Sequence, residues 1–104
     1  MWAVIEPDGR VEFREDEPVL RTVFGGYKPE QIDVDEALGA TVWISSGAET
    51  RGLDANFPVT ALLAGKTTGW TPMLGRVAIL GSNGQLPVEL FEQLKALQQR
   101  YVTA

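Results

Sequence analysis

The chain has 104 residues, of which 44% are hydrophobic and 22% charged, the size and composition of one globular domain rather than of a disordered segment. It contains neither cysteine nor histidine, which excludes disulfides, thiolate nucleophiles, imidazole bases and metal sites built on these ligands. The net charge of −5 disfavours direct binding to nucleic acid. We therefore expect a single domain over residues 1–104.

The charge is distributed unevenly along the chain. Residues 1–56 hold twelve acidic and five basic side chains, a net of −7, whereas residues 57–104 carry a net of +2. An acidic surface can attract a basic partner, and it can also simply keep a protein in solution. No apolar run approaches the roughly 18 residues of a membrane span, and the N-terminus lacks the features of a secretory signal. We expect a cytoplasmic protein that contacts no membrane.

The first predicted elements are a hairpin and a short helix. In residues 1–14 the turn sequence Pro7-Asp8-Gly9 separates two strands, the second of which alternates apolar and charged side chains. Residues 15–25 predict a helix that starts with three acidic residues and Pro18 and is ended by Gly25-Gly26. Its expected apolar face comprises Val19, Leu20, Val23 and Phe24.

The middle of the chain predicts an extended segment, a turn, a strand, a polar loop and a short helix, at residues 27–34, 35–39, 40–45, 47–55 and 57–63. The strand is dense in β-branched and aromatic residues, and Trp43 within it is expected in the core. Asn56 is expected to cap the helix, with Pro58 in its first turn.

The last third predicts a loop over residues 66–72, a strand over 76–80, a turn over 81–84 and a helix from Pro87 to about Tyr101. The helix carries an apolar stripe at Leu90, Leu94, Leu97 and Tyr101. This stripe is expected to pack into the core, with a dimer seam as the alternative, so a monomer and a homodimer both stay open. The predicted fold is α+β, a four- to five-stranded mixed or mostly antiparallel sheet with the C-terminal helix on one face and two short helices.

One group of residues is a candidate site for a small phosphate-bearing molecule. Trp70 would stack on a base, Lys66 would neutralise the phosphate, and the amides of the turn over residues 81–84 would hold it. The group comprises Lys66, Thr67, Thr68, Trp70, Ser82 and Asn83. A tight Asn-Gly turn and a tryptophan folded over the core are the structural alternatives.

A second group forms a candidate acidic surface for a basic partner: Glu15, Asp16, Glu17, Asp33, Asp35 and Glu36. The alternative is a solvated acidic surface. The group lacks the alternating oxygen ligands and closing glutamate of a calcium loop, so no metal site is expected. Ala64-Gly65-Lys66-Thr67 resembles the end of a phosphate-binding loop, but Thr60 stands where that pattern needs a glycine. We expect neither a cofactor nor a catalytic residue.

Several short segments together resemble a family of small proteins. They are Val4-Ile5-Glu6-Pro7-Asp8-Gly9, Gly25-Gly26-Tyr27 at a helix end, Gly52-Leu53, Asn56, Gly75 and Leu86-Pro87-Val88-Glu89-Leu90. The chain resembles, over nearly its whole length, the uncharacterised family of phage, plasmid and bacterial proteins known as domain-of-unknown-function family thirty-eight forty-six. It departs from such members at residues 45–51, where they carry an acidic turn. The resemblance implies a mobile-element origin and supplies no activity.

The sequence thus predicts a small non-catalytic interaction protein, of phage or mobile-element origin, that binds a host protein in the bacterial cytoplasm. The alternative is a protein that sequesters a small molecule such as a nucleotide signal. The third hypothesis is an enzyme with carboxylate or serine–lysine chemistry, for which no motif is visible.

Overall fold

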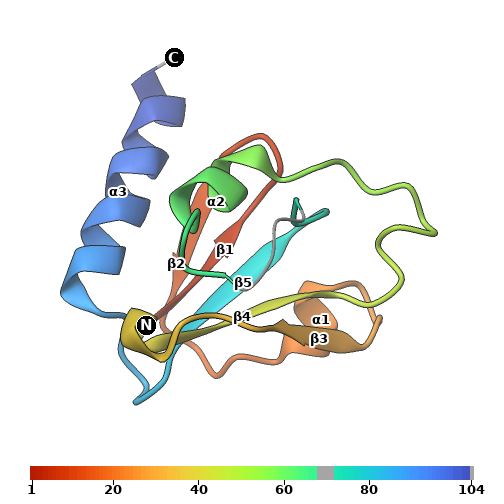
Figure 1. Ribbon diagram of the computed structural model, residues 1–104, viewed down its shortest axis with the longest axis horizontal. Helices are drawn as coiled ribbons and strands as arrows, with labels where there is room; N and C mark the ends of the chain where they lie inside the picture. The colour runs from red at the N-terminus through yellow and green to blue at the C-terminus, as the bar shows by residue number, and fades with distance from the viewer. Residues whose placement is uncertain (68–71, 104) are drawn as a thin grey trace.

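The chain folds into a five-stranded sheet with helices on both faces (Figure 1). The computed structural model describes residues 1–67 and 72–103, without the side chains of residues 101–103. The strands are β1 (Trp2–Ile5), β2 (Val11–Arg14), β3 (Pro29–Ile32), β4 (Ala40–Ser45) and β5 (Val77–Gly81). The helices are α1 (Leu20–Val23), α2 (Phe57–Leu62) and α3 (Val88–Thr103), and η1 (Glu36–Leu38) is a 3-10 turn. The predicted α+β fold is confirmed.

The strands lie in the order β2-β1-β5-β4-β3, and each adjacent pair is antiparallel. The last strand in the sequence, β5, therefore occupies the centre of the sheet between β1 and β4. The hairpin strand β2 forms one edge, and β3 forms the other. The described part of the sheet is thus antiparallel throughout rather than mixed.

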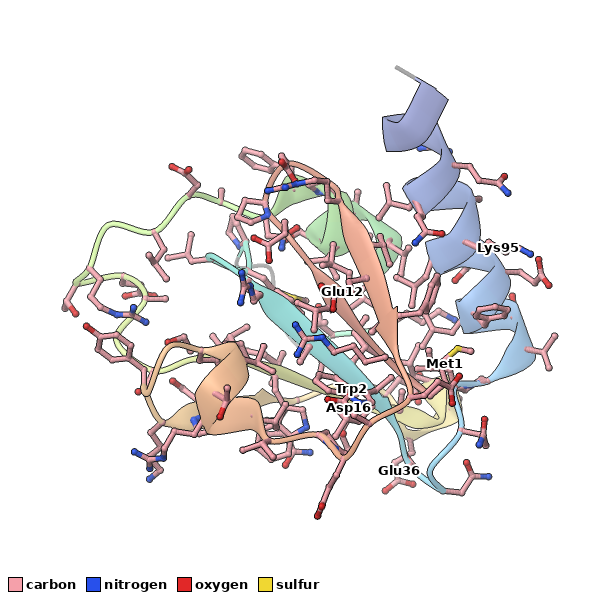
Figure 2. The ribbon with its side chains drawn as sticks, turned by 180° about the vertical axis from the view of Figure 1, so that it is seen from behind. Met1, Trp2, Glu12, Asp16, Glu36 and Lys95 are labelled. Atoms are coloured by element: carbon pink, nitrogen blue, oxygen red, sulfur yellow. The ribbon has the colours of Figure 1, made fainter. Side chains whose placement is uncertain are left out.

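Each face of the sheet carries its own apolar cluster, because alternate side chains of a strand point to opposite faces. On one face Val42, Val77 and Ile79 pack with residues of α2, its C-cap and α3, among them Val59, Leu63, Leu90, Leu94 and Leu97. On the other face Trp2, Val4 and Ala78 pack with Val23 and Phe24 at α1. Figure 2, seen from behind, shows this α1 side of the molecule.

The apolar stripe of α3 lies in the core, as predicted. Leu90, Leu94 and Leu97 are 3%, 0% and 8% exposed, whereas the side chain of Tyr101 lies outside the described residues. The helix also donates a hydrogen bond from the Gln98 Nε2 to the carbonyl oxygen of Val11 on β2, 2.9 Å away. Among the described helices, none combines the length and apolar composition that crossing a bilayer requires.

Asn56 caps α2, as predicted, and also ties the helix to the sheet. Its fully buried side-chain oxygen accepts from the Val59 amide at 3.3 Å. Its Nδ2 donates to the carbonyl oxygens of Ile5 and Gly75, at 3.0 and 2.9 Å. One amide group thereby satisfies the end of β1, the segment that leads to β5 and a helix N-terminus, all of which are shielded from water.

The helix predicted over residues 15–25 is much shorter in the structure, because α1 begins only at Leu20. Pro18 disfavours helical geometry at the residue before it, and the main-chain carbonyl of Asp16 accepts a 2.8 Å hydrogen bond from the indole of Trp2. The segment ahead of α1 therefore does not continue the helix, and Val19, expected on the apolar face of that helix, is 55% exposed. The predicted stop is confirmed, since Gly25 and Gly26 both have positive φ angles.

Candidate functional site

A cavity of about 490 Å³ lies beside the edge strand β3, and we call it the β3 cavity. Its walls come from β3, the end of β4, the loop that follows β4 and the segment that leads to β5. The lining residues are 30–33, 44, 45, 47–50, 67 and 72–74. No residue of α2 or α3 lines this cavity, so among the described residues these two helices do not cover this part of the sheet face on which they pack.

The floor of the β3 cavity is apolar. Ile32 and Ile44 are half-buried and pack against the α2–α3 core, and Met73 belongs to that core. Leu74 completes the apolar lining. In the register of β3 with β4, Glu30 stands opposite Ile44, which places a carboxylate beside this floor on the same face of the sheet.

Three acidic residues line the β3 cavity from two segments: Glu30 and Asp33 at β3, and Glu49 in the loop after β4. All three are exposed, and none forms an ion pair with the residues that the structure describes. Within the described ranges no three acidic side chains lie close enough together to hold a metal ion. Separate carboxylates beside an apolar floor instead suit an extended ligand with several positive charges and apolar parts, such as a peptide segment with lysine or arginine stems.

The loop that forms one wall of this cavity is fastened to the sheet by Arg51. Its guanidinium lies over the ring of Tyr27, 3.6 Å from the ring centre, an attractive cation–π arrangement. The Nη2 of Arg51 donates to the buried Oγ of Ser45 and, at 3.1 Å, to the carbonyl oxygen of Ser46. The amide of Ser46 in turn donates to the main-chain carbonyl oxygen of Lys28, next to β3, at 2.9 Å. The wall is therefore held by groups just before β3 and at the end of β4.

The six residues predicted to bind a phosphate-bearing molecule are not gathered in one cavity. Thr67 bridges to Val34 and lines the β3 cavity, whereas the exposed Lys66 does not line it. Ser82 and Asn83 follow β5, while Pro72–Leu74 of the cavity precede it, so they lie at opposite ends of that strand. Thr68 and Trp70 lie outside the described residues.

The turn after β5 already uses most of its amides. The amide of Ser82 donates to the carbonyl oxygen of Gly39 at 3.0 Å, and that of Gly84 to the carbonyl oxygen of Gly81 at 3.1 Å. The amide of Gln85 donates to the Asn83 side-chain oxygen at 3.3 Å. A phosphate at this turn would have to displace these hydrogen bonds. The geometry therefore favours the structural alternative, a tight turn closed on itself.

The predicted acidic surface is divided between the two edges of the sheet. Its first three members follow β2, where Glu15 lies 3.9 Å from the N-terminal ammonium and Glu17 is exposed. Figure 2 shows Asp16 beside Trp2 at this end of the sheet, and Glu36 apart from both. The remaining members follow β3: Asp35 caps η1 by accepting from the Ala37 amide at 3.0 Å, and Asp33 lines the β3 cavity.

Sequence reasoning missed Glu30, Glu49, Tyr27 and Arg51 as members of a site. Glu30 and Glu49 are isolated acids in the sequence and become neighbours of one cavity only through the pairing of β3 with β4. The one signal available was Arg51 itself, a single basic residue in an otherwise acidic and polar loop.

Comparisons of the chain with models of protein families, with curated proteins and with solved structures found no match. The site must therefore be interpreted from its own chemistry.

Proposed function

We propose that this protein is a non-catalytic binding domain that takes up a basic, partly apolar segment of a partner protein in the β3 cavity. The observation that carries the proposal is the combination of an apolar floor with three carboxylates that have no basic partner in the described chain. Lysine and arginine fit such a surface, because their aliphatic stems bury against apolar groups while their charged ends reach carboxylates.

The resemblance to phage and plasmid proteins makes a bacterial host protein the partner we propose. The same cavity does not favour the nucleotide-sequestering alternative, because the three carboxylates around Thr67 would repel a phosphate group. A chain without histidine or cysteine also offers few groups for acid–base or nucleophilic chemistry, which supports binding rather than catalysis.

The test is a titration of the protein with a synthetic peptide in which lysines alternate with leucines. Binding is monitored through the chemical shifts of the backbone amide NMR signals of the protein. We expect the largest shifts at Ile32, Ile44 and Leu74, and weaker binding when the salt rises from about 0.05 M to about 0.5 M. The triple variant E30Q/D33N/E49Q should bind about tenfold more weakly, because three exposed charge contacts of about 0.5 kcal/mol each are lost.

The matched control is E15Q/D16N/E17Q, which removes the same number of negative charges at the other edge of the sheet. It should change the affinity less than about twofold. Equal losses in both variants would show that the peptide responds only to net charge, and the proposed site would be wrong.

A further inference from the structure

A second cavity of about 340 Å³ lies beside α1, and we call it the Arg51 cavity. It is bounded by the turn after β1, the end of α1 with its glycine stop, the end of β4, the loop before α2 and the residues just before β5. Four charged residues line it, namely Glu6, Arg51, Asp54 and Arg76, together with the apolar Val23, Phe24 and Leu53. None of these apolar residues belongs to the β3 cavity.

Two of the four charged side chains, those of Glu6 and Arg76, pair with each other within the protein. Arg76 forms an ion pair with Glu6, and its Nη1 donates to the main-chain carbonyl of Val23 at 2.8 Å. These contacts fasten the end of α1 to β5. The other two, Arg51 and Asp54, have no oppositely charged partner in the part of the chain that the structure describes, although they line the same cavity.

The guanidinium of Arg51 has donors to spare. Its Nη2 is occupied by Ser45 and Ser46, and no hydrogen bond from its Nη1 occurs among the described residues. Its Nε–H also meets no acceptor there, but it is buried, so a ligand contacts it only after the surrounding side chains move. The Tyr27 ring fixes the plane of the guanidinium from one side. A planar guanidinium with unused donors is the group that recognises a carboxylate most specifically.

We propose that the Arg51 cavity binds a small zwitterion, an α-amino acid with an apolar side chain. Its carboxylate would be held by Arg51, its ammonium by Asp54, and its side chain by the apolar wall of Val23, Phe24 and Leu53. A simple anion would be repelled by Asp54 and a simple cation by Arg51, whereas one molecule that carries both charges satisfies both.

The test compares leucine with its two halves, 3-methylbutylamine and 4-methylpentanoate, by titration of the folded full-length chain. Binding is followed at the backbone amide signals of Gly25, Leu53 and Gly75, and at the Nε–H signal of Arg51. We expect saturable binding of leucine, and binding of either half at least about tenfold weaker. No binding of leucine, or equal binding of either half, overturns the proposal.

Two variants separate ligand binding from a merely structural role of Arg51. D54N should weaken leucine about tenfold and strengthen 4-methylpentanoate, because the carboxylate that repels this anion is gone. R51K should weaken both ligands, because a lysine has no planar fork. D16N, which alters an exposed carboxylate away from this cavity, is the control and should change neither. Unchanged leucine binding in D54N would overturn the proposal even if R51K failed to fold.

Discussion

At the scale of single residues, Asn56 is a buried polar group on which the fold depends. Its side chain makes three hydrogen bonds with main-chain groups of β1, α2 and the segment that leads to β5, and it is fully buried. Asn56→Ala would leave two carbonyls and one amide without partners, so we expect the free energy of unfolding to fall by about 3 kcal/mol. Urea denaturation of the variant measures this loss.

Asn83 provides the matched control for this substitution. It is exposed, and its side chain accepts one 3.3 Å hydrogen bond from the Gln85 amide in the turn after β5. Because water can replace that contact, Asn83→Ala should cost less than about 1 kcal/mol. A similar fall in the free energy of unfolding in both variants would mean that burial does not determine how much the Asn56 hydrogen bonds stabilise the fold.

At the scale of elements, the attachment of α3 to the sheet rests on its apolar stripe. Leu94 is 0% exposed at the centre of the helix, whereas Glu92 faces solvent. Leu94→Ala should lower the free energy of unfolding by about 3 kcal/mol through lost burial and the cavity it leaves. Glu92→Ala should change it by less than about 0.5 kcal/mol. Denaturation of the two variants tests this difference, and a small effect at Leu94 would place the helix outside the core.

The same scale shows which features the sequence could predict. The strand over residues 40–45 and the last helix were predicted closely because their patterns are local and strong. Most of the predicted helix at 15–25 did not form, since Pro18 and the contact of Trp2 with Asp16 outweighed a weak apolar pattern. The β3 cavity is built from segments up to 44 residues apart, and only the strand order brings them together.

At the scale of the whole molecule, one sheet supports two apolar clusters that share its five strands. Trp2 and Trp43 report on the α1 face, and the helical circular dichroism reports mainly on α3 at the other face. Because both clusters pack on the same sheet, unfolding of the sheet disrupts both of them. We therefore expect one cooperative unfolding transition. In the variant Trp70→Phe, which retains only these two tryptophans, fluorescence and circular dichroism should give the same midpoint. Separate midpoints would contradict this.

The central position of β5 in the sheet also determines when the sheet can form during synthesis of the chain on the ribosome. During synthesis the β1–β2 hairpin and the β3–β4 hairpin emerge first, but no described strand pairs with both of them until residues 77–81 have left the ribosome. Until then the apolar strands β1 and β4 each expose an unpaired edge, the kind of surface that recruits other chains. A nascent chain stalled before Val77 should therefore be a target for chaperones, whereas one that has passed Gly81 can close its sheet.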